Sequence, residues 1–336
     1  MESHAPVMSA GTLGASSQRA GLAFAGLCAL NGAFVAPIAR VATAQTDPLQ
    51  VAVFVTLFAA LAAAIVLGVR GRLGTLFRGR DAWVFAALGA MGTMVPNVLF
   101  FWGTARTSAL DAALCLQTEP VISLLLAWLV LGHRLTLRRS LSAALLLIGI
   151  GVAATGEAAR DPLGVAMLLA TPIAWQSSHL LVLRRLPSTT PELLTGARYV
   201  WGGFWLGLVA LVWTAVSGRP TMLMLDPRTE LPLIAVQGVG MYYVGTMLWY
   251  QAISRLDLAR ATSIVVPSVP VLTLAVAYLL LGEVPSRSQL VGLCFMTVGV
   301  VSFVTAPHAI ETRERVPTQM APLAADAEAE AGGDAA

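Results

Sequence analysis

The chain has 336 residues, of which 57% are hydrophobic and 12% are charged, and its mean hydropathy is +0.76. Soluble domains carry about 25% charged residues, so this composition argues against a soluble globular enzyme, a disordered chain and a nucleic-acid binder. The 21 basic residues are all arginine, and an excess of arginine in short loops is typical of proteins that cross a membrane several times.

Ten apolar runs follow one another along the chain. A bilayer core needs about 20 apolar residues per helix, and the fifth and tenth runs are short enough to borrow residues from their flanks. No run alternates apolar and polar residues as a barrel strand would. The sequence therefore predicts an all-α membrane protein with ten transmembrane helices. The runs are 20–39, 49–69, 83–102, 108–131, 141–154, 163–183, 195–216, 231–250, 259–281 and 290–304.

The two ends of the chain are predicted to be tails. Residues 306–336 are rich in Ala, Glu and Asp and lack periodicity, so we expect a disordered cytoplasmic tail. Residues 1–19 are predicted to be a cytoplasmic N-terminal tail. A cleaved signal peptide is the alternative, because residues 42–44 read Ala-Thr-Ala like a cleavage site. The first run is longer than the usual apolar region of about 7–15 residues, which favours an uncleaved first span.

The distribution of arginine predicts the orientation. If the N-terminus is cytoplasmic, fourteen arginines lie in cytoplasmic segments and six on the opposite side, while Arg198 lies inside a run. Cytoplasmic loops of membrane proteins carry the excess of basic residues. We therefore expect a multi-pass protein of a bacterial inner membrane with both termini inside the cell.

The sequence resembles itself after a shift of 150 residues. Proline and glycine matches are informative because each has its own backbone geometry. The matched pairs are Pro120-Val121 with Pro270-Val271, Leu131-Gly132 with Leu281-Gly282, and Gly149 with Gly299. Five spans per half is an odd number, so equivalent helices cross in opposite directions. This predicts a 5+5 inverted repeat, residues 20–155 and 160–305, a symmetry that alternating-access transporters use; duplication without transport is the alternative.

Two segments resemble a known family. Residues 118–121, Thr-Glu-Pro-Val, lead into the apolar run 124–132, and residues 267–283 read PSVPVLTLAVAYLLLGE. Both are similar to the EamA-type domain of the drug/metabolite transporter superfamily, and the resemblance covers about residues 20–305. It implies ten helices, a central cavity and export or exchange of small metabolites. The first copy departs from the pattern, with His133 where the second copy has Glu283, an acid expected at a water-accessible span end.

Glu119 is the first candidate for a substrate- or proton-binding residue. It lies eleven residues from Ser108 and twelve from Leu131, which at about 1.5 Å per residue places it near the bilayer midplane. An ionisable group there is functional by default. Pro120 frees a helix carbonyl beside it, which is tolerated where protein or a wet cavity covers the backbone. Glu119 and Ser123 share a face; the alternative is a buried acid locked to a neighbouring helix.

Charged and helix-breaking residues supply further candidates. Pro267 and Pro270 in the ninth run weaken a helix twice, which predicts a break facing the cavity or a static bend. His179 is a candidate proton relay or an interfacial histidine. Arg198 is a candidate partner for a substrate carboxylate or an acid, or an arginine that snorkels to the headgroups.

Polar and aromatic residues complete the candidate set. Asn31 is a candidate ligand contact, with interhelical hydrogen bonding as the alternative. Trp175 and Tyr242 are candidates to stack on an aromatic or cationic substrate. Tyr250 lies at a run end and is interpreted as part of the interfacial aromatic belt.

We therefore expect a secondary transporter that exports small amphipathic metabolites, amino acids or amines, by alternating access. The three cysteines lack metal spacing, and no phosphate-binding loop occurs, so we expect no metal, cofactor or catalytic residue. The alternatives are a membrane-embedded enzyme, such as a lipid or prenyl transferase, and a channel or receptor. The expected partners are a small-molecule substrate and the lipid bilayer, not nucleic acid, and a homodimer stays open.

Overall fold

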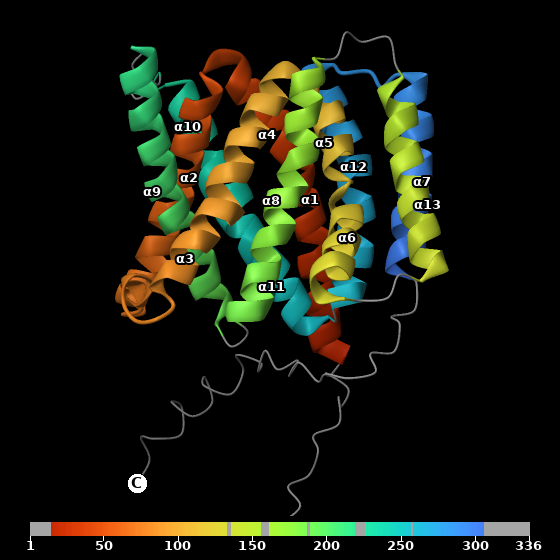
Figure 1. Cartoon of the computed structure of the whole chain (residues 1–336). Helices are drawn as coiled ribbons and strands as arrows, with labels where there is room; N and C mark the ends of the chain where they lie inside the picture. Colours follow the sequence, from red (N-terminus) through yellow and green to blue (C-terminus); the bar gives the residue numbers. More distant parts are fainter. Residues whose placement is uncertain are drawn as a thin grey trace, which may run out of the picture.

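The computed structural model describes residues 15–132, 136–155, 161–186, 189–218, 226, 228–256 and 258–305. Within these ranges the chain is helical and contains no strand. Figure 1 shows the helices standing side by side in one bundle, with their ends gathered at two opposite faces. The expectations for residues 1–14, for residues 306–336 and for His133 fall outside the described ranges.

Each predicted apolar run coincides with helical structure, and only the fourth run is interrupted, at Gln117-Thr118. In chain order the elements are α1 (Ala15–Gln45), α2 (Pro48–Val69), η1 (Leu73–Phe77), α3 (Ala82–Gly89), η2 (Ala90–Met94), α4 (Val95–Arg106), α5 (Ala109–Leu116), α6 (Glu119–Leu131), α7 (Leu137–Ala154), α8 (Pro162–Arg185), α9 (Pro191–Ser217), α10 (Glu230–Ala235), η3 (Val236–Val244), α11 (Gly245–Arg255), α12 (Leu258–Leu281) and α13 (Arg287–Val304).

Eight helical stretches among the described residues are long and apolar enough to cross a membrane. They correspond to the predicted runs other than the fifth and the tenth. The tenth run forms α13, whose apolar part is shorter, and the fifth forms α7, an 18-residue helix with Arg138 and Arg139 in its first turn. These two stand beside each other in Figure 1. The described part of the chain is thus that of an all-helical, multi-pass membrane protein.

The helix ends have local causes in the sequence. Asp47 accepts hydrogen bonds from the amides of Leu49 and Gln50 and so caps α2, while Ser286 forms a capping box with Gln289 at the start of α13. The helices that end at Leu131 and Leu281 are each followed by a glycine with a positive φ, which is 68° at Gly132 and 64° at Gly282. The Leu-Gly match found in the sequence is therefore also a match in backbone conformation.

The helix break lies in the first half of the chain. The fourth apolar run divides into α5 and α6 at Gln117-Thr118, and Pro120 occupies the first turn of α6, where its missing N–H is tolerated. In contrast, α12 continues as one helix through Pro267 and Pro270. The structure thus shows no helix break at Pro267 or at Pro270.

Two helices contain wide π-helical turns at corresponding places. The π segment η2 lies between α3 and α4, and η3 lies between α10 and α11. A shift of 150 residues carries Thr93 of η2 onto Tyr243 of η3. In each segment a side chain from another helix binds a backbone carbonyl: Arg198 donates to Gly92 at 2.7 Å, and Asn31 to Gly240 at 2.8 Å.

Helices α7 and α13 pack through small residues. A Cβ atom at Gly292 would lie 2.5 Å from the carbonyl oxygen of Gly149, and one at Gly299 would lie 3.1 Å from that of Ser142. The 150-residue shift relates these two contacts. Gly149 corresponds to Gly299 and Ser142 to Gly292, so the contact between Gly149 and Gly292 corresponds to the contact between Gly299 and Ser142. The Ser142 and Ser302 hydroxyls are 3.0 Å apart. Small residues of this kind let membrane helices approach closely.

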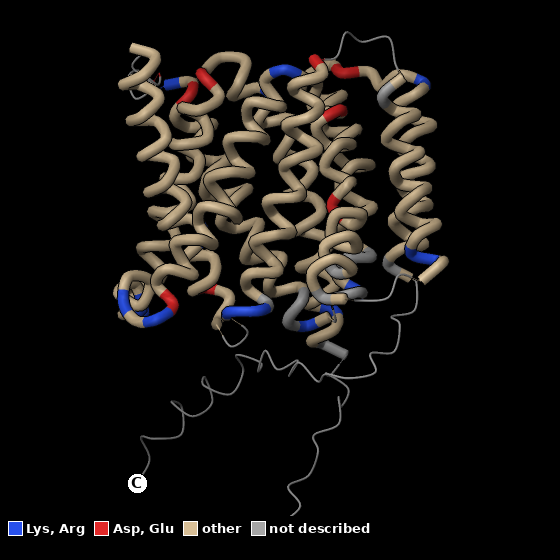
Figure 2. Tube along the Cα trace, viewed as in Figure 1, with Lys and Arg blue, Asp and Glu red and all other residues tan. Residues whose placement is uncertain are grey.

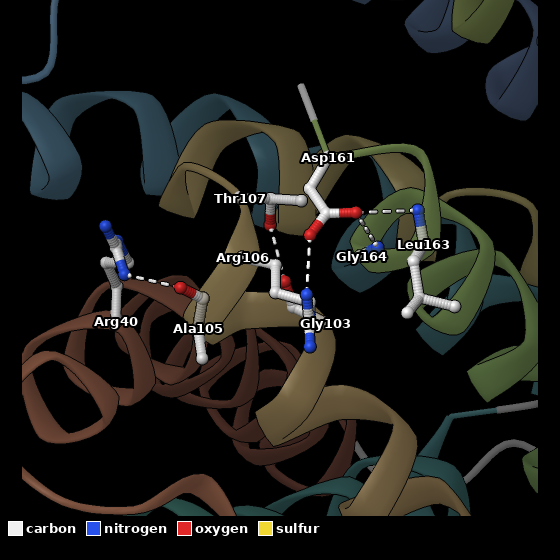
Figure 3. A network of polar contacts seen from close by, with 8 residues as sticks. All are labelled: Arg40, Gly103, Ala105, Arg106, Thr107, Asp161, Leu163 and Gly164. Carbon is white, nitrogen blue, oxygen red and sulfur yellow. Dashed lines mark hydrogen bonds and ion pairs between the residues drawn. The ribbon is translucent and has the colours of Figure 1, made fainter. Parts of the chain in front are cut away.

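A polar network joins helices at the upper end of the bundle in Figure 1 (Figure 3). Arg106 at the end of α4 forms an ion pair of 2.7 Å with Asp161, which also accepts hydrogen bonds from the amides of Leu163 and Gly164 at the start of α8. Arg40 at the end of α1 donates to the carbonyl oxygen of Ala105 at 3.1 Å. The network therefore ties the start of α8 to helices of the first half.

Replacing Asp161 by asparagine should lower thermal stability in a pH-dependent way. The hydrogen bond from Arg106, helped by the two amides, lowers the pKa of the Asp161 carboxyl. A carboxyl whose pKa is lowered by folding adds stability above its unfolded pKa of about 3.9, and this is lost as the pH falls toward the folded value. Asparagine still caps a helix, so the substitution isolates the charge.

The measurement is the melting temperature of wild type and Asp161→Asn from neutral to acidic pH. We expect a constant difference near neutral pH that shrinks below about pH 4. In an Arg106→Gln background the same substitution should have a much smaller effect. A difference that persists unchanged at the acidic end would show that the charge of Asp161 is not its cause.

Candidate functional site

Five polar side chains from four helices meet inside the bundle. Glu119 is the first residue of α6, Gln176 and His179 lie on α8, Arg198 lies on α9 and Tyr250 lies on α11. All five are half-buried. Because these helices lie far apart in the sequence, the cluster exists only when the bundle is assembled.

Glu119 lies midway along the candidate span Ala109–Val130, directly after the break between α5 and α6. The amides of Gln117 and Thr118 turn back to carbonyls three residues earlier and close the end of α5. The new helix thus begins at Glu119, and its N-terminal dipole favours a carboxylate there. The Gln176 side-chain amide donates to Glu119 Oε1 at 2.6 Å. The acid is therefore joined to a neighbouring helix, but through a neutral partner.

Arg198 is held by neutral groups inside the bundle. Its guanidinium donates to the carbonyl oxygen of Gly92 at 2.7 Å and is hydrogen-bonded to the Tyr250 hydroxyl, while its Nε is buried without a hydrogen-bond partner. Among the described residues no carboxylate forms an ion pair with it. These contacts point inward, which does not fit an arginine that snorkels to the headgroups. An intramembrane cation without a counter-ion is a functional candidate by default.

The charge of Arg198 acts on two of its neighbours, the Glu119 carboxylate and the His179 ring. A side chain at Gly92 would interfere with this arrangement, since its Cβ would lie 3.1 Å from Ser178 Oγ and 3.2 Å from Arg198 Nε. The glycine thus gives the guanidinium access to the π segment. Glu119, His179 and Arg198, predicted separately, are brought together by the fold.

Tyr242 of η3 contacts aromatic residues from other helices. The ring of Tyr242 stacks on Phe101 with centroids 6.2 Å apart and meets Tyr199 edge-on at 6.4 Å. The Tyr199 hydroxyl donates to the Tyr242 carbonyl oxygen at 3.0 Å and is 2.8 Å from the Thr246 hydroxyl. Tyr242 therefore contacts two aromatic rings within the protein.

The other predicted residues lie elsewhere or add no polar contact to the cluster. Asn31 bonds the Gly240 carbonyl and packs against Gly245, as expected of an interhelical hydrogen bond. Ser123 lies one turn beyond Glu119 and is exposed. Trp175 is half-buried on α8, and its carbonyl oxygen accepts a bond from the Ser178 hydroxyl.

Two residues of the cluster were not predicted as site residues. Gln176 carries no charge and stands out only as a polar residue in an apolar run. Tyr250 was interpreted as part of the interfacial belt, but its hydroxyl bonds Arg198. Tyr250 faces inward because α11 packs against α9. No local pattern in the sequence predicts that packing.

Glu283, expected at a span end that water can reach, lies just after the end of α12 and is half-buried. Its half-buried carboxylate accepts hydrogen bonds from the amides of Ala109 at 3.1 Å and Leu110 at 3.2 Å, at the start of α5. Beside it, buried Asp111 accepts a bond from the Gln289 side chain at 3.0 Å. Both acids therefore join the fourth apolar helix of the first half to the end of the second half.

Comparison with known proteins identifies the class. The model of the EamA-like transporter family matches residues 19–155 and 162–305. The chain belongs to this family, which confirms the resemblance found in the sequence. Among the described residues no group of three or more His, Cys, Asp or Glu side chains is placed to hold a metal ion.

Individual relatives carry transporter names. The chain is 30% identical over 230 residues to a probable terminal-alkyne amino-acid exporter of Streptantibioticus cattleyicolor, covering 67% of this chain and 73% of that protein. It is 24% identical over 229 residues to the uncharacterized transporter YyaM of Bacillus subtilis, covering 66% and 73%. A crystal structure with 17% identity superposes with a TM-score of 0.61 over 85% of this chain and 96% of that one, which shows a shared fold.

Glu119→Gln should separate transport from folding. Glutamine keeps the size of the side chain and an oxygen that accepts the Gln176 hydrogen bond, and a neutral amide is cheaper to bury than an ion. We therefore expect wild-type expression and thermal stability. If the Glu119 carboxylate contacts a cationic group of the substrate, losing this charge-assisted contact should lower the transport rate about tenfold or more.

Glu230→Gln is the matched control. Glu230 also lies in the first turn of a helix and is bonded to a neutral side chain, the Thr46 hydroxyl at 2.7 Å. It lies at the start of the candidate span Glu230–Ala252, rather than midway along a span. Glu230→Gln should transport as wild type does. Wild-type transport by Glu119→Gln would exclude a role in transport, and loss of folding would show that Glu119 is structural.

Proposed function

We propose that the protein is a secondary transporter that exports small amphipathic metabolites of the amino-acid or amine class by alternating access. One observation carries the proposal: a member of the EamA-like family holds a carboxylate, Glu119, and a guanidinium, Arg198, inside its helix bundle, and each is bonded to neutral partners. Charges kept inside a membrane protein without a counter-ion of their own are suited to a charged ligand.

The two charges match the two ends of an amino acid. A carboxylate binds an ammonium group, and a guanidinium binds a carboxylate in a planar, two-point geometry. The Nε atom of Arg198, which lacks a partner in the bundle, supplies a donor for such a contact. The name of the Streptantibioticus relative, an amino-acid exporter, supports the same substrate class.

Alternating access is supported by the relation between the two halves. We propose ten transmembrane helices in a 5+5 inverted repeat, residues 20–155 and 160–305. Three features recur after the 150-residue shift: the positive-φ glycines 132 and 282, the π segments η2 and η3, and the exchanged contacts of α7 with α13. Inverted repeats of this kind allow two equivalent states open to opposite sides of the membrane.

Charge distribution supports the orientation. In Figure 2 the basic positions are more numerous at the lower end of the bundle, where α1 begins, than at the upper end. We propose that the lower end faces the cytoplasm of a bacterial cell and that both termini lie there, as the bias of basic residues toward the cytoplasm requires.

Reporter fusions test this topology. An enzyme reporter that is active only inside the cell, fused after residue 336, should be active, and the same reporter inserted near Arg160 should be silent. A reporter active only outside the cytoplasm should give the opposite pattern. Equal activity at the two sites would overturn the proposed topology, because the five spans proposed between them must place the two sites on opposite sides of the membrane.

Flux measurements test the substrate class. Purified protein in liposomes should exchange radiolabelled amino acids, with saturable uptake that an unlabelled substrate on the other side accelerates. Glu119→Gln should impair amino acids and amines more than simple carboxylates, and Arg198→Gln should impair amino acids and carboxylates more than amines.

The alternatives give different results. Flux that neither saturates nor responds to unlabelled substrate on the other side would indicate a channel. Chemical conversion of the added compounds would indicate a membrane-embedded enzyme. Equal losses for all three compound classes in both variants would overturn the division of roles between Glu119 and Arg198.

A further inference from the structure

A second charged site lies at the lower end of the bundle, away from the Glu119–Arg198 cluster. The loop between α2 and α3 and the start of α9 enclose a cleft of about 200 Å³, partly open to solvent. The polar lining comes from two directions. The loop contributes Arg72, Thr75, Arg78, Arg80 and Asp81, and the segment before α9 contributes Thr189 and Thr190.

The cleft has an excess of positive charge. Three arginines line it against one acid, Asp81, and within the described ranges none of the three forms an ion pair. Glu192, in the first turn of α9, forms an ion pair of 2.9 Å with Arg70 through Oε1, which offsets its charge, and its Oε2 is buried without a hydrogen-bond partner. Three neighbouring guanidinium groups without counter-ions repel one another, and a bound anion removes that repulsion.

The loop is held in place rather than free. Leu76 of η1 is buried, and its carbonyl oxygen accepts a hydrogen bond from the Trp201 indole at 3.1 Å. The ring of Phe77 lies 5.4 Å from the same indole. Gly71 and Gly79, with φ of 65° and 84°, allow the reversals on either side of η1. The arginines are therefore carried on a backbone that is anchored to α9.

Two further features of the cleft suit an anion. The 27-residue helix α9 begins at Pro191, so the positive end of its dipole is directed toward the cleft. The Oγ1 atom of Thr190 is buried and has no hydrogen-bond partner in the protein. A buried hydroxyl without a partner calls for an explanation, and the oxygen of a bound anion supplies its missing acceptor.

We propose that this cleft binds a phosphate group, carried by an anionic lipid headgroup or free in solution. Phosphate offers several acceptor oxygens, which match guanidinium forks and threonine hydroxyls. The neighbouring surface suits a lipid. Phe77 within the basic loop and Trp83 just after it have more than half of their surfaces exposed, at 52% and 58%. Basic pockets at the cytoplasmic ends of membrane helices are a known setting for acidic headgroups.

The test uses the purified full-length protein in a neutral detergent. Melting temperature is measured while phosphatidylglycerol, zwitterionic phosphatidylcholine or inorganic phosphate is added. The cleft variant is Arg78→Gln with Arg80→Gln. The matched control, Arg19→Gln with Arg184→Gln, removes two exposed arginines from the same end of the bundle but outside the cleft. Asp81→Asn is a third variant, which removes the acid from the lining.

We expect saturable stabilisation of the wild type by phosphatidylglycerol and little by phosphatidylcholine. The cleft variant should need about tenfold more lipid or greater, because two charge-assisted contacts are lost, and the control should bind as the wild type does. Asp81→Asn should bind more tightly, by about twofold or more. Added salt should weaken binding in every case.

Each outcome decides the proposal. If inorganic phosphate reproduces the effect of the lipid, the cleft takes the free ion; if only the lipid stabilises, it takes the headgroup. Equal losses in the cleft variant and the control would overturn the proposal, because general surface charge would explain them. If the cleft variant fails to fold, Asp81→Asn decides: binding no tighter than that of the wild type would overturn the site.

Discussion

The structure depends on one constraint: a bilayer core supplies no water, so every backbone polar group within it must find its partner in the protein. Wide π turns and the break between α5 and α6 depart from regular helical bonding. Side chains bind the carbonyls in two of these places, Arg198 at Gly92 and Asn31 at Gly240. The irregular backbone and the intramembrane polar residues thus stabilise each other.

This arrangement explains how an arginine and a glutamate lie in one bundle without forming an ion pair. Each charge has a neutral partner of fixed geometry: a carbonyl oxygen for Arg198 and a side-chain amide for Glu119. A direct ion pair would be stable but inert, since a ligand would have to break it. Neutral partners fix the positions of the two side chains without neutralising their charges. The two charges can therefore interact with each other and with a ligand.

The sequence predicted the fold better than the site, for physical reasons. Apolar length is a local property, so every predicted run coincides with helical structure. Pro120 also marked the place where a helix is interrupted. The partners of Arg198 could not be predicted, because Gly92 and Tyr250 reach it only through the packing of three helices. The bonds of Glu283 to the start of α5 could not be predicted for the same reason, because its position at a span end does not show which helix terminus packs against it.

The contact of Glu283 with the start of α5 has a consequence for biosynthesis. The amide of Ala109 leaves the ribosome 174 residues before the carboxylate that it will bind. Until then the first turn of α5 lacks this acceptor, and Asp111 lacks the side chain of Gln289. Helices α1 to α7 can therefore enter the membrane early, but this end of α5 reaches its final bonding only when α12 and α13 arrive. Maturation of the first half is thus a late event in the assembly of the chain.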